Sequence, residues 1–169
     1  MNDAVDISLI IGIVVTMVLS AFFSGMEMAF VTSNRMLFEM DKEKNGIANH
    51  LVNFFYRQGN DFVSTMLVGN NAVLVVYGIL IARFFDNTIF QGLSPTVTVP
   101  ADTIISTIIM LFTGEFLPKT LFRRNPNRLM TVFSPLAFLF YIVLWPVSRV
   151  ATSLSKMLLR IIGIRIEKE

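Results

Sequence analysis

The sequence predicts an all-α membrane protein in which three transmembrane helices are joined by helices that lie on the membrane surface. Of its 169 residues, 54% are hydrophobic and only 15% are charged, and the mean hydropathy is +0.65. Soluble domains carry more charge, so this composition indicates a membrane protein. Its apolar stretches reach about 20 residues, the length that crosses a bilayer as a helix, and the alternating pattern of a β-barrel is not found.

The scarcity of reactive side chains excludes several classes of function. The chain has no cysteine and a single histidine, which excludes disulfides, thiolate metal sites and cysteine catalysis. No nucleophile is accompanied by a suitable base, so we expect no enzyme activity. A formal net charge of +2 is too small to predict a nucleic-acid partner.

The distribution of basic residues predicts the orientation in the membrane. Spans are expected over residues 7–31, from 62 to 81 or 85, and from about 101 onward. The connector 32–61 carries four basic residues, whereas the loop 86–100 carries none. Basic connectors stay in the cytoplasm. We therefore expect a multi-pass protein of the cell membrane, inner or plasma, with its N-terminus outside and its C-terminus cytoplasmic.

The apolar run 129–147 is expected to lie along the inner membrane face and not to cross. A crossing would place the basic tail outside, against the positive-inside rule. The basic residues of that tail are Arg149, Lys156, Arg160, Arg165 and Lys168. Pro135 and Pro146 also interrupt the run. We therefore divide the chain into a three-span domain with surface helices, residues 1–147, and an amphipathic juxtamembrane helix, residues 148–169.

The third span ends in the first candidate site, around Glu115. A carboxylate at membrane depth is costly, and it is by default a functional-site hypothesis. Pro118 has no N–H, so in a helix the carbonyl of Gly114 would lose its partner. A carboxylate beside a freed carbonyl suits a hard cation such as Mg²⁺. The alternative is that Glu115 pairs with Lys119 one turn away and that Pro118 only kinks the helix.

Two further motifs join a glycine to oxygen-bearing side chains in the other spans. They are Ser24-Gly25-x-Glu27 in the first span and Gly69-Asn70-Asn71 in the second. Each motif alone could be a notch of small residues for helix packing, or a source of interhelical hydrogen bonds. Together the three motifs predict helices that are interrupted near mid-membrane around one shared cation site, as in transporters.

In these motifs the chain resembles the membrane domain of the CorC/CNNM (cyclin M) family. The matching segments are Phe22-Phe23-Ser24-Gly25-x-Glu27-x-Ala29, Val68-Gly69-Asn70-Asn71 and Gly114-Glu115-x-x-Pro118-Lys119. They occur in the family's order and at its spacing, and the resemblance covers essentially the whole chain. It implies a homodimer of three-span subunits with a cytoplasmic belt of juxtamembrane helices.

The resemblance also implies Mg²⁺ transport, usually export by alternating access that Na⁺ drives. It implies metal ligands from the side chains of Ser24, Asn70 and Glu115, helped by a carbonyl of Gly25 or Gly69. The residues expected to support these ligands or to couple transport are Glu27, Asn71, Gly114, Pro118 and Lys119. The partners would be a second copy, membrane lipids, Mg²⁺ and Na⁺. Family members continue into cytoplasmic CBS domains, so we expect the chain to be part of a longer protein.

A function from a different class stays open beside transport. The chain could be a membrane anchor and dimerisation module that relays cytoplasmic sensing and transports nothing. Its three motifs would then be packing notches. Ion density bound at Glu115 would distinguish the two functions.

Overall fold

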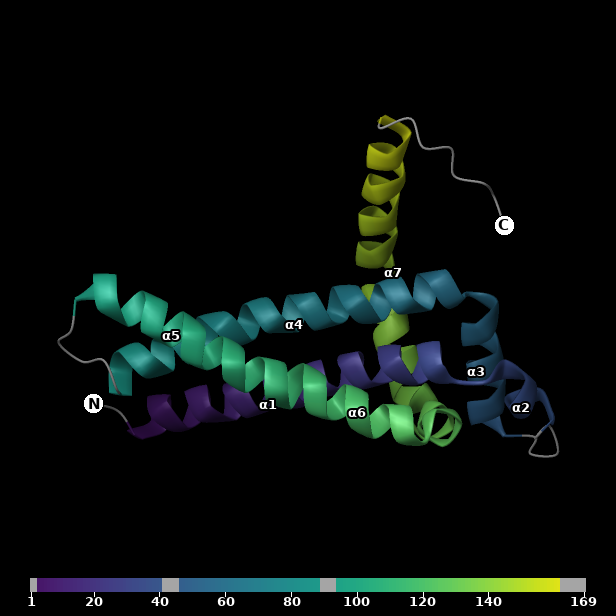
Figure 1. The fold of residues 1–169 in the computed structure, drawn as a ribbon, viewed down its shortest axis with the longest axis horizontal. Helices are drawn as coiled ribbons and strands as arrows, with labels where there is room; N and C mark the ends of the chain where they lie inside the picture. Colours follow the sequence, from purple (N-terminus) through teal and green to yellow (C-terminus); the bar gives the residue numbers. More distant parts are fainter. Residues whose placement is uncertain (1–2, 41–45, 89–93, 162–169) are drawn as a thin grey trace.

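The computed structural model describes residues 3–40, 46–88 and 94–161, and this part of the chain is helical almost throughout. Three long rods run in approximately the same direction (Figure 1). They are α1 (Asp3–Thr32), α4 (Gly59–Thr88), and a third rod made of α5 (Pro95–Met110), η1 (Leu111–Phe116) and α6 (Leu117–Arg124). The remaining helices are α2 (Arg35–Met40), α3 (Ile47–Arg57) and α7 (Pro126–Ile161). The predicted all-helical class is therefore confirmed for the described residues.

Each rod is long and apolar enough to cross a membrane. The segments that qualify are Ile7–Thr32, Gly59–Thr88 and Thr96–Arg124, with mean hydropathies of 2.4, 1.8 and 1.5. Only 22% to 33% of the most apolar part of each segment is buried within the chain, so most of its apolar surface is left to face lipid. The first rod, α1, is central, because it packs against α4, η1, α6 and α7.

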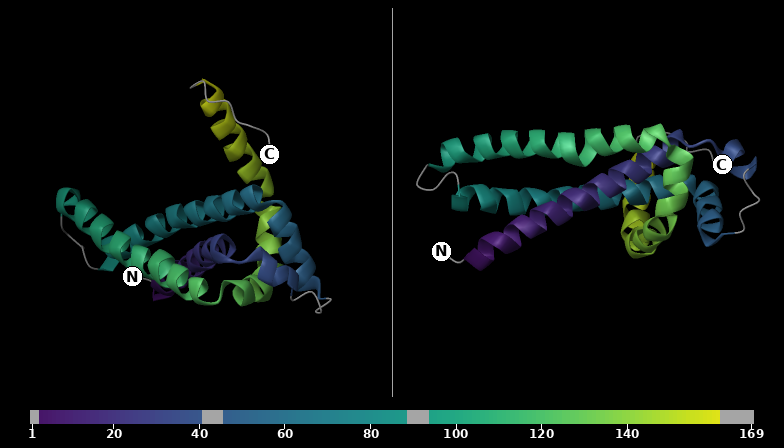
Figure 2. Two further views of the ribbon diagram at one scale, coloured as in Figure 1. Left: turned by 45° about the vertical axis from the view of Figure 1, so that its right-hand side comes forward. Right: turned by 90° about the horizontal axis from the view of Figure 1, so that it is seen from below.

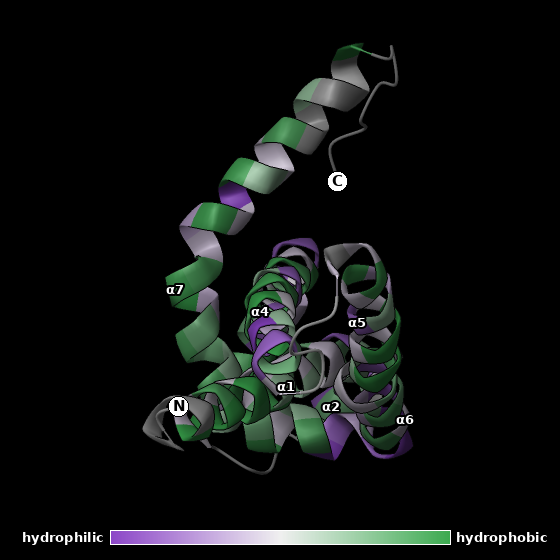
Figure 3. Cartoon of the chain, turned by 90° about the vertical axis from the view of Figure 1, so that its left-hand side faces the viewer, coloured by the Kyte–Doolittle hydropathy of each residue, from purple (hydrophilic) through white to green (hydrophobic). Residues whose placement is uncertain are grey.

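The fourth apolar helix, α7, lies across the rods and not along them. It stands upright where the rods lie horizontal (Figure 1), and it is seen nearly end-on from below (Figure 2). Viewed along the rods, it projects well beyond them (Figure 3). Its segment Pro126–Leu154 has a mean hydropathy of 1.9, so four helices of the described chain could cross a membrane by length and composition. The count of three spans stays a prediction, which the transverse direction of α7 favours.

The structure corrects one helix boundary within α7. The helix continues past residue 148 without a break and contains both Pro135 and Pro146, so no separate helix begins at 148. Pro135 removes an N–H that the Thr131 carbonyl would have accepted. The Ser134 hydroxyl donates to that carbonyl at 2.9 Å instead. A local side-chain hydrogen bond thus replaces the missing backbone bond and lets the helix continue.

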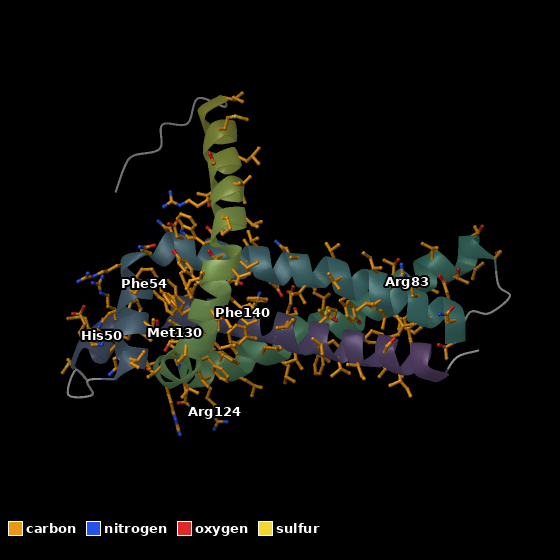
Figure 4. The ribbon with its side chains drawn as sticks, turned by 180° about the vertical axis from the view of Figure 1, so that it is seen from behind. His50, Phe54, Arg83, Arg124, Met130 and Phe140 are labelled. Carbon is orange, nitrogen blue, oxygen red and sulfur yellow. The ribbon has the colours of Figure 1, made fainter. Side chains whose placement is uncertain are left out.

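A core of aromatic side chains holds α7 and α3 to the rods. Phe55 of α3 and Phe62 of α4 are fully buried, with ring centroids 4.3 Å apart. Phe23 of α1 meets Phe140 of α7 edge-to-face at 5.0 Å, where α7 crosses the rods (Figure 4). Large aromatic surfaces in these geometries dominate the packing energy of such a core. The core therefore fixes the direction of α7.

The two ends of the bundle differ in charge. The end of α1 lies with α2, α3, α6 and the start of α4, whereas the start of α1 lies with the end of α4 and the start of α5 (Figure 1). The first group and the start of α7 form what we call the basic end, with Arg35, Arg57, Arg123, Arg124 and Arg128. The opposite end carries Arg83 (Figure 4). Asp86 of α4 and Asp102 of α5 lie in the parts of these helices nearer that end.

Candidate cation site

The third rod changes its helical register at the residues expected to bind an ion. A π-helical turn, η1, contains both Gly114 and Glu115, with α-helix before and after it. Turns of this kind widen the helix by one residue and are frequent at functional sites. The helix interruption predicted for the third span is therefore present.

The register shift changes which backbone carbonyl is left without its usual donors. The N–H of Leu117 donates to the carbonyl of Phe112, five residues back, and Pro118 has no N–H to donate. The carbonyl of Thr113 would accept from Leu117 in an α register and from residue 118 in a π register. It therefore lacks both donors. The sequence had pointed to the neighbouring carbonyl of Gly114, because an unbroken α-helical register was expected there.

The three rods meet at a buried hydrogen bond between α1 and α4. The Ser20 hydroxyl donates to Asn70 Oδ1 at 2.7 Å, and the two residues are 0% and 4% exposed. A Cβ placed on Gly114 of η1 would lie 3.0 Å from Ser20 Oγ and 2.8 Å from Met110 Sδ. A Cβ at this position would therefore crowd Ser20, and glycine avoids that contact. The structure thus brings together Asn70 and Gly114, two of the predicted site residues, through a serine that the sequence analysis missed.

Ser20 belongs to a stripe of hydroxyls on the buried face of α1. Thr16, Ser20 and Ser24 are four residues apart and are all buried, so they lie on one helix face. That spacing was the signal in the sequence that could have identified Ser20. Ser24, one turn from Ser20, is completely buried, and its Oγ has no hydrogen-bond partner in the described part of the chain. Such a group calls for an explanation, and a bound water or ion is one.

Glu115 and Lys119 form the contact that the sequence offered as an alternative. Lys119 Nζ lies 4.0 Å from Glu115 Oε2, and the Glu115 side chain is 29% exposed. Glu115 also lines a cavity of about 500 Å³ between α4 and the third rod. The carboxylate is therefore reachable from this cavity, with a long and partly exposed ion pair beside it.

Gly25 and Gly69 are close-packing positions in this structure. A Cβ on Gly25 would lie 2.7 Å from the Phe122 ring, and one on Gly69 would lie 2.8 Å from Leu144 and 2.9 Å from Phe23. Both α1 and α4 remain regular α-helices through these motifs. The expectation that all three spans are interrupted is therefore wrong for the first and second. Tight packing against large side chains explains these glycines without a break in the backbone.

The other predicted residues differ in burial, and the donor set is poor in carboxylates. Glu27 is partly exposed and Asn71 is exposed, whereas Pro118 is buried at the start of α6. Among the described residues, no three His, Cys, Asp or Glu side chains gather closely enough to hold a metal. A site here would use hydroxyl, amide and carbonyl oxygens with few carboxylates. That set fits Mg²⁺, which keeps several waters and commonly takes one or two carboxylates.

Polar groups toward the opposite end of the same cavity were also missed. Asp102, Tyr77 and Ser106 line it together with Glu115. The Tyr77 hydroxyl donates to the Ser106 carbonyl at 3.3 Å. Asp102 Oδ1 is buried and has no partner in the described part of the chain. Asp102 was not among the site residues that the sequence predicts.

These features define a multi-pass helical membrane protein with a polar site inside its bundle. The chain belongs to the cyclin M family, because residues 11–169 match the family model of the cyclin M transmembrane N-terminal domain. The resemblance seen in the three motifs is thereby confirmed.

Curated relatives support the same assignment. The chain is 29% identical to the UPF0053 inner membrane protein YfjD of Escherichia coli, over 87% of this chain and 33% of that protein. It is 27% identical to the UPF0053 protein MG146 homolog of Mycoplasma pneumoniae, over 85% of this chain and 34% of the relative. The chain thus spans about a third of the length of the relatives it matches.

Proposed function

We propose that the chain is the membrane domain of a Mg²⁺ transporter that exports Mg²⁺ in exchange for Na⁺. The observation that carries this proposal is the buried Ser20–Asn70 pair at the glycine of the π turn, Gly114, which directly precedes Glu115. Polar groups brought together from three membrane helices are characteristic of transporter sites. We propose Mg²⁺ as the ion because the chain belongs to the cyclin M family.

The proposed ligands are the side chains of Ser24, Asn70 and Glu115. Ser24 offers a buried oxygen without a partner in the described part of the chain. The Asn70 amide oxygen accepts one hydrogen bond from Ser20 and keeps a second lone pair for a cation. A carbonyl of Gly25 or Gly69 would complete the set. The residues proposed to support or couple the site are Glu27, Asn71, Gly114, Pro118 and Lys119.

Ion release would use the contact between Glu115 and Lys119. The Lys119 ammonium lies 4.0 Å from the Glu115 carboxylate. A bound Mg²⁺ would take over the carboxylate and displace the ammonium, so the two cations compete for one anion. Mg²⁺ dehydrates reluctantly, which favours a slow alternating-access carrier over a fast channel.

We propose that the active form is a homodimer in the cell membrane, with the N-terminus outside and the basic end in the cytoplasm. The positive-inside rule supports this orientation, and one relative is named as an inner membrane protein. Gly69 packs inside the protomer against Phe23 and Leu144, so it is not available for dimer contacts. Ala72 and Gly78 remain exposed on α4 and are the small residues left for a partner.

Flux measurements in proteoliposomes test the proposal. The purified protein should move Mg²⁺ in response to an opposing Na⁺ gradient, and Glu115→Gln should abolish that movement. Arg83→Gln, a single charge change at the opposite end of the bundle, serves as the control and should transport like the parent. Mg²⁺ flux that is the same with and without the Na⁺ gradient would contradict the coupling, and no flux would contradict transport.

The packing of two glycines favours the second candidate, an anchor and dimerisation module without transport. Gly25 and Gly69 are filled by neighbouring side chains, as packing notches would be. The two candidates differ in ion binding. An anchor module predicts no saturable Mg²⁺ binding to the purified protein and no dependence of that binding on Glu115.

A further inference from the structure

A cavity of about 570 Å³ lies at the basic end of the bundle, lined by none of the proposed ion ligands. Its walls come from the end of α1, from α2 and α3, and from the junction of α6 with α7. Elements from both halves of the chain therefore build it. Its lining includes two arginines, Arg124 and Arg128, two hydrogen-bonded asparagines, Asn34 and Asn127, and the exposed Val132.

The cavity carries positive charge without a counter-charge. Arg124 and Arg128 both line it, and its lining includes no carboxylate. In the described part of the chain the ion pairs are Arg35 with Glu39 and Lys119 with Glu115, so neither cavity arginine has a carboxylate within ion-pair distance there. Two guanidinium groups at one cavity favour an anion with several oxygens, such as a phosphate.

Reciprocal hydrogen bonds hold the walls of the cavity in register. The Asn34 N–H donates to Asn127 Oδ1 at 3.0 Å, and Asn127 Nδ2 donates to the Asn34 carbonyl at 3.4 Å. This pair joins the segment between α1 and α2 to the first turn of α7. The backbone that carries Arg128 is thereby fixed against the opposite wall.

An apolar stripe on α7 begins at the edge of the cavity. Val132 lines the cavity and is 60% exposed. Leu136, Leu139 and Val143 follow at helical spacing and are 43%, 57% and 62% exposed. Arg128 lies one turn before Val132 on the same face. The positive charge of Arg128 and the exposed apolar stripe thus lie on one side of α7.

We propose that this cavity binds the phosphate of an anionic membrane lipid, whose acyl chains lie along the apolar stripe of α7. Basic pockets between membrane helices on the cytoplasmic side suit such headgroups. A free phosphate or a nucleotide could satisfy the arginines, but it would leave the stripe uncovered. The lipid covers both, and it would hold α7 against the membrane surface. This site does not depend on which ion the protein carries.

Lipid binding by the purified protein tests the proposal, with phosphatidylglycerol as the probe and phosphatidylcholine as its uncharged-headgroup counterpart. We expect native mass spectrometry to show saturable binding of phosphatidylglycerol and weaker binding of phosphatidylcholine. Arg124→Gln and Arg128→Gln should each weaken phosphatidylglycerol binding about fivefold, the effect typical of one basic residue at a membrane surface. Leu136→Asn should weaken lipid binding and leave the binding of inorganic phosphate unchanged.

Arg123→Gln is the matched control. It removes the same charge beside Arg124, is exposed on α6 and does not line the cavity, so lipid binding should match the parent. Equal losses in Arg123→Gln and Arg124→Gln would overturn the proposal in favour of general surface charge. Inorganic phosphate that competes fully with the lipid at equal affinity would overturn the lipid assignment. Circular dichroism without lipid identifies any variant that fails to fold, and the other arginine variant then carries the test. Arg128→Lys, which keeps the charge, should bind phosphatidylglycerol like the parent, and a fivefold loss there would contradict a role for the charge of Arg128.

Discussion

Ser20 and Asn70 are joined by a buried hydrogen bond of 2.7 Å, although 50 residues separate them in the chain. The bond ties α1 to α4 where Gly114 allows η1 to approach. It also fixes the direction of the Asn70 amide oxygen before any ion arrives. Preorganised ligands lose less conformational entropy on binding, so the pair would serve the proposed ion site as well as the fold.

Ser20→Ala should destabilise the protein even without ions. The substitution removes the donor and leaves Asn70 Oδ1 buried without a partner, which typically costs about 1–3 kcal/mol of unfolding free energy. Unfolding of the purified variant in mild detergent, followed by circular dichroism, measures this loss. A variant as stable as the parent would show that another donor, such as water, replaces the hydroxyl.

Unlike Ser20→Ala, Ser24→Ala should weaken Mg²⁺ binding without lowering the stability of the ion-free protein. The Ser24 hydroxyl has no hydrogen-bond partner in the described chain, so the ion-free protein should be as stable as the parent or slightly more stable. Mg²⁺ affinity, measured by isothermal titration, should fall because one neutral oxygen ligand is lost. A clear loss of ion-free stability with unchanged Mg²⁺ affinity would exclude Ser24 as a ligand.

Glu115→Gln should abolish Mg²⁺ binding more completely than Glu27→Gln. Glu115 lies in the π turn and lines a cavity, whereas Glu27 lies near the basic end of α1. The fold should tolerate Glu115→Gln, because the 4.0 Å contact with Lys119 is partly exposed and such pairs contribute little. Isothermal titration of both variants ranks them. If Glu27→Gln loses binding and Glu115→Gln keeps it, the site is centred on the first span.

Gly25→Ala should destabilise the protomer, and Gly78→Ala should not. The new Cβ at position 25 would lie 2.7 Å from the Phe122 ring, and overpacking of this kind typically costs about 1–3 kcal/mol. A Cβ added at Gly78 would meet nothing within 4 Å, and alanine there should stabilise the helix by roughly 0.5–1 kcal/mol. Thermal unfolding compares each variant with the parent, and a Gly25→Ala variant as stable as the parent would show that Phe122 moves aside.

Single cysteines should report the proposed topology. These 169 residues contain no cysteine, so each introduced thiol is unique among them. A cysteine at Thr88 should react with a membrane-impermeant reagent added to intact cells, whereas cysteines at Asn127 and Ser153 should react only after permeabilisation. Ser153 lies in the far half of α7. Labelling of Ser153→Cys from outside would mean that α7 crosses the membrane.

Local sequence was enough to predict the class of this protein and the segments that carry its candidate site. Hydropathy and helix length depend on near neighbours in the chain. The spans predicted from the sequence therefore largely coincide with the three rods of the structure. Glu115 and Pro118 likewise marked an irregular turn, because proline removes a backbone donor wherever it occurs in a helix. The positions of Asn70 and Gly114 near one another also followed from three motifs pointing to one site.

Tertiary packing decided what no local pattern encodes. Asn70 is paired with Ser20, and Gly69 is enclosed by Phe23 and Leu144, because the contact of one helix with another depends on the faces that all of them present. The transverse direction of α7 has the same origin, since the aromatic core and not its own hydropathy sets its angle. The order of residues determines which side chains are available to pack, and only the assembled bundle selects their partners.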